Sequence, residues 1–173
     1  MKIDYSKKSK VSFLLSTMLL GTVSLSASVG TVLNNQTLEI DNNYKVNMYY
    51  LSNNSQLINK ASNNNRLDIE NSENSSITNN SSLNVIDDWT AINAHEIENS
   101  QIINNGNINI LGDSSNDVNG IDVLNLVKSR VVNKGNIISN LNSDATVNGI
   151  VVRDAQGSSI KNTGTINLKA TGD

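Results

Sequence analysis

The sequence contains no cysteine and no proline, and only 3% of its residues are aromatic. Without cysteine, a disulfide framework, a thiolate metal site and a cysteine nucleophile are all excluded. Without proline, every backbone N–H group can donate to a strand ladder. The few aromatic side chains provide few large anchors for an ordinary globular core. Stability must therefore come from aliphatic packing and hydrogen-bonded ladders.

Asparagine is the residue type in excess, at nearly a fifth of all positions. Such polarity is typical of disordered chains, but those chains are poor in β-branched residues. Here Ile and Val recur at regular intervals between the asparagines. The composition therefore favours regular β-structure.

Residues 1–28 have the three parts of a secretory signal peptide. Lysines gather in the first ten residues, a mostly apolar run covers residues 11–23, and mostly small residues follow at 24–28. This pattern predicts a helical signal peptide that is cleaved after Ser26 or Ser28. The alternative is an uncleaved membrane anchor, but the run is shorter than the ~20 apolar residues that a spanning helix needs. We therefore expect an exported protein.

The charges that remain after residue 28 are mostly acidic. Residues 1–28 include four of the 13 basic residues and one of the 16 acidic residues, so the remainder has 9 basic and 15 acidic residues, a net charge of −6. The acidic residues are scattered, and no basic stripe with interleaved aromatics remains. Nucleic-acid binding is therefore not expected, and neither is attraction to anionic membranes.

A degenerate pattern repeats from Ile77 onward. It reads apolar, any, Asn, any, Gly or Ser, any, apolar, any, and usually apolar again. Its copies begin at Ile77, Ile102, Val131 and Ile160. A second shared element begins at Trp89, Val118 and Val147, and its third residue lies 13 residues before the next Asn of the pattern each time. Successive pattern Asn residues are 25, 29 and 29 apart, so one loop of variable length lies between the two elements.

The repeat predicts the fold class. Apolar and polar residues alternate within each element, as in a half-buried strand, and turns at Asn-Gly, Lys-Gly and Thr-Gly separate the elements. Three strands per unit make one closed coil. We predict an all-β chain that forms a right-handed parallel β-helix of about three coils over residues 76–173. Residues 29–75 repeat less well and are expected to form an imperfect N-terminal cap or an irregular coil. A β-sandwich of the same strands gives no reason for the constant spacing.

Stacked coils place equivalent residues about one strand spacing apart, ~4.8 Å. Two interior columns are predicted at Ile77, Ile102, Val131, Ile160 and at Leu83, Ile108, Ile137, Ile166. A structural ladder of amides is predicted at Asn79, Asn104, Asn133 and Asn162, because stacked Asn side chains can bond up and down the stack. Turn glycines are predicted at Gly106, Gly135 and Gly164, at a bend that needs a positive φ. Ser81 interrupts that glycine column.

These motifs resemble a known family. The segments Asn119-Gly120-Ile121, Asn148-Gly149-Ile150 and Ile160 to Ile166, behind a signal peptide, are similar to the repeats of autotransporter passenger domains. The resemblance implies the Sec export machinery, an outer-membrane β-barrel at the C-terminal end of the same polypeptide, and display at the cell surface or release. It also implies a surface ligand, protein or glycan. Residues 76–173 show no barrel segments, so we expect the front of a longer protein or a truncated gene.

Candidate catalytic and metal-binding residues are few. His95 is the one histidine and is expected in a surface loop without a role, so a Ser-His-Asp site is not expected. Asp87 and Asp88 have the residue types of a glycosidase pair or a Ca²⁺ site, but the variable loop makes ordinary solvated acids the simpler interpretation. The segment 113–117 begins like a Ca²⁺ loop, yet Val118 replaces the required glycine. We predict no catalytic, cofactor or metal site.

Two further residues allow more than one interpretation. Arg153 and Asp154 are interpreted as a turn pair. Trp89 either covers an end of the stack or contacts sugar. The function hypothesis is a non-enzymatic surface stalk or adhesion segment. The alternatives are a fragment of an exported polysaccharide-degrading enzyme, which would need clustered carboxylates on one face, and a truncated remnant without independent function.

Overall fold

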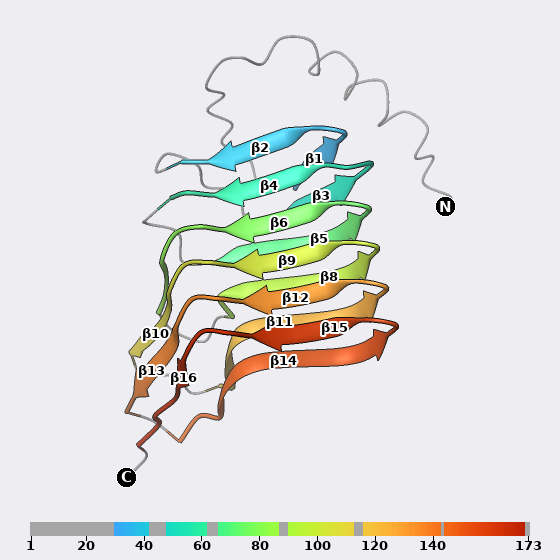
Figure 1. Cartoon of the computed structure of the whole chain (residues 1–173). Coiled ribbons are helices and arrows are strands. Elements are labelled where there is room, and N and C mark those ends of the chain that lie inside the picture. Colours follow the sequence, from blue (N-terminus) through green and yellow to red (C-terminus); the bar gives the residue numbers. More distant parts are fainter. Residues whose placement is uncertain are drawn as a thin grey trace, which may run out of the picture.

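A computed structural model describes residues 30–41, 48–61, 66–86, 90–112, 116–142 and 144–171. These residues form strands in three parallel sheets, and no helix (Figure 1). Sheet A contains β1 (Thr31–Asn34), β3 (Tyr49–Ser52), β5 (Leu67–Glu73), β8 (Ile92–Glu98), β11 (Val118–Val127) and β14 (Val147–Gln156). Sheet B contains β2 (Thr37–Ile40), β4 (Gln56–Asn59), β6 (Ser76–Asn79), β9 (Gln101–Asn104), β12 (Arg130–Asn133) and β15 (Ser159–Asn162). Sheet C contains β7 (Leu83–Ile86), β10 (Ile108–Gly112), β13 (Ile137–Leu141) and β16 (Ile166–Asn167).

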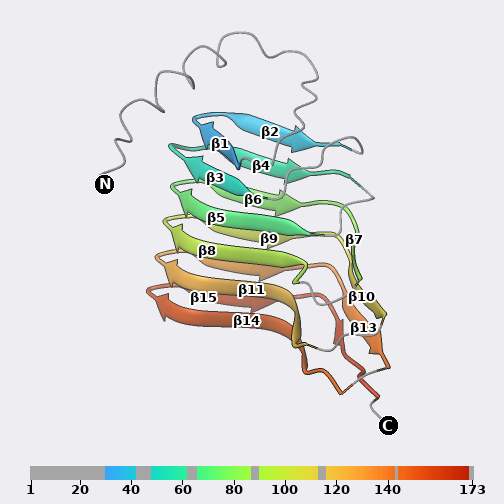
Figure 2. The same ribbon diagram turned by 180° about the vertical axis from the view of Figure 1, so that it is seen from behind.

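The chain passes from sheet A to sheet B to sheet C and then returns to sheet A one coil further on, as Figures 1 and 2 show from opposite sides. The predicted all-β parallel solenoid is confirmed. Its three most regular coils are β8-β9-β10, β11-β12-β13 and β14-β15-β16, as the repeat predicts. The predicted signal-peptide helix lies outside the described residues.

The register follows the predicted columns. In the first column, Ile77 pairs with Ile102, which pairs with Val131. In the second column, Leu83 pairs with Ile108, which pairs with Ile137. Both columns reach the last coil, where their final members are Ile160 and Ile166. The side chains of the inner coils are completely buried. They form one continuous core of stacked aliphatic residues along the axis.

The stack extends upstream of the repeat. Strands β1 to β4 form two coils without a described sheet C strand, and their register is less regular, with a shift between Tyr49 and Tyr50. In β5, Leu67 and Ile69 pair with Ile92 and Ala94 of β8. Residues 30–41 and 48–61 therefore add two less regular coils to the same stack, and β5 begins the first coil with three described strands, β5-β6-β7.

The last coil, β14-β15-β16, is the C-terminal end of every sheet, and we call it the foot. No described strand lies beyond it. Its interior residues consequently lose their cover on one side, and Ile160 is 47% exposed and Ile166 39% exposed. The same columns are 0% exposed one coil earlier, at Val131 and Ile137.

Candidate functional site

An asparagine ladder runs inside the turn between sheets B and C. Each Asn Nδ2 donates to the Asn Oδ1 of the next coil at 2.7 Å. Its second N–H bond reaches the carbonyl oxygen two residues later at 2.7–2.9 Å. The ladder residues are Asn59, Asn79, Asn104, Asn133 and Asn162. The four asparagines of the repeat thus lie in one column, and their amides both join successive coils and hold the turn.

The ladder has a different environment at each end. At its head the column continues into Ile40, which is completely buried, and the Asn59 Oδ1 accepts the Ala61 N–H at 3.2 Å. At the foot, Asn162 is exposed, with no described amide beyond it. The interior asparagines are buried with their polar groups paired, which removes the desolvation cost of an unsatisfied amide.

The glycines of the repeat do not have the predicted backbone conformation. Among the described glycines only Gly112 and Gly157 have a positive φ. A Cβ atom on Gly135 would instead lie 1.9 Å from the Gly106 carbonyl oxygen, and the same distance separates a Cβ on Gly164 from the Gly135 oxygen. The prediction of a positive φ at Gly106, Gly135 and Gly164 was therefore wrong. Glycine is needed there because successive turns approach too closely for a side chain.

A serine ladder at the corner between sheets A and B is not predicted by the repeat. From the second serine onward, each Oγ accepts the backbone N–H of the serine one coil earlier, for example Ser75 N to Ser100 Oγ at 2.9 Å. It also donates to the carbonyl two residues before it, as Ser100 does to Glu98 at 2.7 Å. The ladder residues are Ser55, Ser75, Ser100, Ser129 and Ser158. Each lies four residues before a ladder asparagine, and this constant Ser-x-x-x-Asn spacing was the available signal.

The residue before each serine turns the chain from sheet A to sheet B. Asn54, Asn74, Asn99, Lys128 and Gly157 occupy this position, with φ between 46° and 64°. Asparagine and glycine adopt this left-handed conformation more readily than other residues, and Lys128 is the exception in the column. The two-residue corner is therefore constant from coil to coil.

The residues with candidate chemistry are not brought together. His95 lies within β8 rather than in the loop predicted for it, and its Nδ1 is 3.9 Å from the Glu70 Oε2. Asp87, Asp88, Trp89 and the segment 113–115 fall outside the described residues. Among the residues that the structure does describe, no group of three His, Cys, Asp or Glu could hold a metal ion.

Arg153 does not form the predicted turn pair. Its Nη2 lies 2.9 Å from the Oδ2 of Asp122 on the neighbouring coil. Asn119 Nδ2 donates to the same oxygen at 2.8 Å, and Asp122 is nearly buried. The Arg153–Asp122 ion pair joins β14 to β11 at the outer face of sheet A, and Asn119 holds the same carboxylate from within β11.

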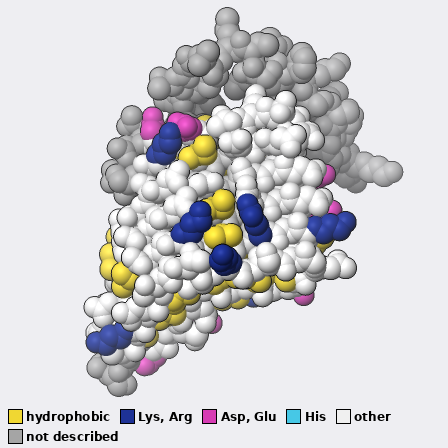
Figure 3. Space-filling view, viewed as in Figure 1, with side chains coloured by type: hydrophobic (Ala, Val, Ile, Leu, Met, Phe, Trp, Pro, Cys, Tyr) yellow, Lys and Arg dark blue, Asp and Glu magenta, His cyan; other side chains and the backbone are white. Residues whose placement is uncertain are grey.

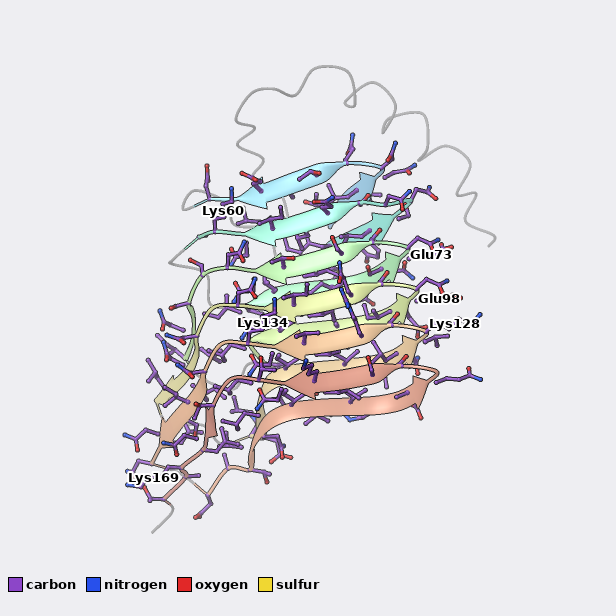
Figure 4. All side chains as sticks on the ribbon, viewed as in Figure 1. Lys60, Glu73, Glu98, Lys128, Lys134 and Lys169 are labelled. Carbon is purple, nitrogen blue, oxygen red and sulfur yellow. The ribbon has the colours of Figure 1, made fainter. Side chains whose placement is uncertain are left out.

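The outer faces of sheets A and B carry opposite charges. On sheet A, Glu70, Glu73, Glu96 and Glu98 lie on the outer face of β5 and β8. On sheet B, the strands from β4 to β15 carry no Asp or Glu. Figure 3 shows Lys and Arg side chains gathered over sheet B with apolar side chains between them, and Figure 4 shows Glu73, Glu98 and Lys128 along the corner.

An open polar groove follows the corner between sheets A and B. It is lined by residues from successive coils, including Asn99 and Lys128 on one side and Gln101, Arg130 and Ser159 on the other. The serine ladder also lines it. The groove therefore presents amide and hydroxyl groups along its first three coils, and serine hydroxyls with Lys128 and Arg130 nearer the foot.

No helix among the described residues has the length and apolarity to span a membrane. Comparison with protein-family models, with curated proteins and with solved structures finds no match. The function must therefore be inferred from the ladders, faces and groove of the solenoid itself.

Proposed function

We propose that this chain is the front part of an exported, autotransporter-like surface protein. In this proposal a right-handed β-solenoid serves as a non-enzymatic stalk or adhesion segment at the cell surface. The right-handed sense follows from the strong preference of parallel β connections for that hand. The signal-like residues 1–28 support export.

The observation that carries the proposal is the contrast between the three corners of the coil. The corner between sheets A and B keeps two residues in each of the last four coils, and the corner between sheets B and C keeps three. The third corner, between sheets C and A, differs in length. It comprises residues 87–91 in one coil and residues 112–120 between the equivalent positions of the next coil. Two constant corners build a rigid rod. The variable third corner is where such a rod can present different loops.

Export is tested by producing the full chain in a bacterial host and sequencing the N-terminus of the exported fraction. We expect a new N-terminus after Ser26 or Ser28. A matched variant with Leu14→Arg and Leu15→Arg interrupts the apolar run and should keep the chain in the cytoplasm. Cytoplasmic retention of the unaltered chain with its first residues intact would contradict the proposal.

Surface display is tested separately, by reading the coding sequence downstream of residue 173. A run of ~10-residue alternating segments with aromatic girdles there would place the chain in front of an outer-membrane barrel. Protease treatment of intact cells producing the extended protein should then remove the solenoid. Protection from protease in intact cells, with cleavage after lysis, would contradict display.

A further inference from the structure

Three cations form a basic patch on the outer face of sheet B. Arg130 and Lys134 begin and follow β12, and Lys161 lies on β15 opposite Val132. All three are exposed, and none takes part in an ion pair among the described residues. The cations are close because strands are ~4.8 Å apart and each residue advances ~3.3 Å along a strand.

The patch is unusual for this molecule. The net charge is −3 for the whole chain, and the acids of the described coils lie mainly on sheet A. On sheet B the one acidic residue, Glu39, is on β2 and pairs with Lys60 at 2.7 Å. The three cations of the basic patch therefore face solvent without a nearby described carboxylate, and their field is directed outward.

Arg130 is held in position at the rim of the groove. Its Nε donates to the Oε1 of Gln101 on β9 at 2.9 Å, and its Nη2 reaches the same oxygen. A guanidinium has five N–H groups, so three remain for another ligand in a fixed orientation. This preorganisation lowers the entropy that a binding partner would otherwise have to remove.

We propose that the groove and the basic patch together bind a linear anionic polysaccharide, one that carries carboxylate or sulfate groups. The groove would accept the sugar chain along the axis, where amides and hydroxyls from successive coils meet its hydroxyl groups. Arg130, the one cation of the basic patch that lines the groove, would pair with an anionic group of the sugar chain, and Lys161 and Lys134, further across sheet B, would attract its remaining charges. This inference deepens the proposed function by naming the class of ligand. It rests on the proposed function only because the solenoid must be displayed outside the cell to meet such a ligand.

The shape of the site favours a polysaccharide over other polyanions. The groove and the patch contain no aromatic side chain on which the bases of a single-stranded nucleic acid could stack, and duplex DNA is distinguished by the test below. A membrane surface is flat and would contact the patch without entering the groove. An acidic protein loop would use the charges but has no reason to follow several coils. A linear glycan in the groove contacts Arg130 directly and carries its anionic groups beside the rest of the patch.

The binding test uses the purified full chain with heparin as sulfated probe, polygalacturonate as carboxylated probe and dextran as neutral control. The patch variant combines Arg130→Gln with Lys161→Thr, since Gln101 and Thr78 occupy the same positions in other coils. The control variant combines Lys60→Asn with Lys169→Asn and loses the same charge elsewhere. We expect the patch variant to bind an anionic probe at least about tenfold more weakly, and the control variant to bind it within about twofold.

The groove is tested without a change of charge. Ser76→Trp places a large side chain in the groove, whereas Thr78→Trp places the same side chain outside it on the same strand. We expect Ser76→Trp to weaken polysaccharide binding and Thr78→Trp to leave it unchanged. Circular dichroism of each variant checks that the β-structure is retained.

Polyglutamate, duplex DNA and vesicles of anionic lipid serve as competing probes. The inference would be overturned if these probes bound as tightly as the anionic polysaccharides and Ser76→Trp did not weaken polysaccharide binding. The patch would then act only by general electrostatic attraction. Absence of binding to both anionic polysaccharides would also overturn it. Either result leaves the export experiment unaffected, so the two proposals can fail independently.

Discussion

The centre of the stack and its foot contain the same columns but differ in what covers them. Ile137 and Ile166 are register partners, yet the first is 0% exposed and the second 39% exposed. Asn133 and Asn162 show the same contrast, since Asn133 bonds to an amide on each side. Two residues of the same type in a solenoid therefore contribute differently to the free energy of unfolding, depending on whether coils cover them on both sides.

The largest expected effect separates these two positions directly. Ile137→Asp places an unpaired charge between covered coils and should cost at least about 4 kcal/mol of unfolding free energy. Ile166→Asp, at the exposed end of the same column, should cost about 1 kcal/mol. Urea unfolding followed by circular dichroism measures both. Ile138→Asp, on the outward face, is the surface control, and an equal loss in all three variants would contradict the register.

The next effect concerns the asparagine ladder. Asn133→Leu removes the acceptor of Asn104 and the donor to Gly135 O, and each buried group left unpaired costs about 1 to 3 kcal/mol. Asn162→Leu affects only one neighbouring amide and should cost less. Thermal melting of the two variants tests the difference. A neutral or stabilising Asn133→Leu would mean that the ladder contributes nothing to stability.

A smaller loss is expected from the glycine column. Gly135→Ala forces a Cβ against the Gly106 carbonyl and should destabilise the stack by about 1 to 3 kcal/mol through backbone displacement. Ser81 already has a side chain at the head of this column, so Ser81→Ala should change the unfolding free energy by less than about 1 kcal/mol. If Gly135→Ala melts like the unaltered chain, the coils at this turn are further apart than described.

Substitutions at the foot should have the smallest effect on folding. Their main effect should be on the association of one chain with another. The foot exposes Ile160, Ile166 and the edges of three sheets, which can pair with another chain. Residues 29–173, made alone, should therefore self-associate, which light scattering measures. Ile160→Lys with Ile166→Lys should abolish association and shift the melting temperature by only a few degrees, as expected for about 1 kcal/mol. A stable monomer before substitution would contradict this prediction.

The repeat predicted the interior of the coils well because strand alternation and a constant spacing leave little freedom. The Ile and Asn columns follow from one alignment, and their partners in the structure are the aligned residues. The turn glycines were placed correctly in sequence but explained wrongly, because a pattern cannot distinguish a positive φ from a close approach of two backbones. The serine ladder was missed because the alignment began at the apolar residue two positions after each serine.

The sequence by itself determined the fold class, the strand spacing and the residues that stack, since these follow from periodicity along the chain. Only the tertiary structure decided which charges meet. Arg130, Lys134 and Lys161 form no basic stripe in the sequence and become neighbours because one complete coil returns β15 beside β12. His95 and Arg153 acquired their partners in the same way, from adjacent coils. The repeat length gives the register partners, but only the closed coil decides which of their side chains lie on the same face without an opposite charge nearby.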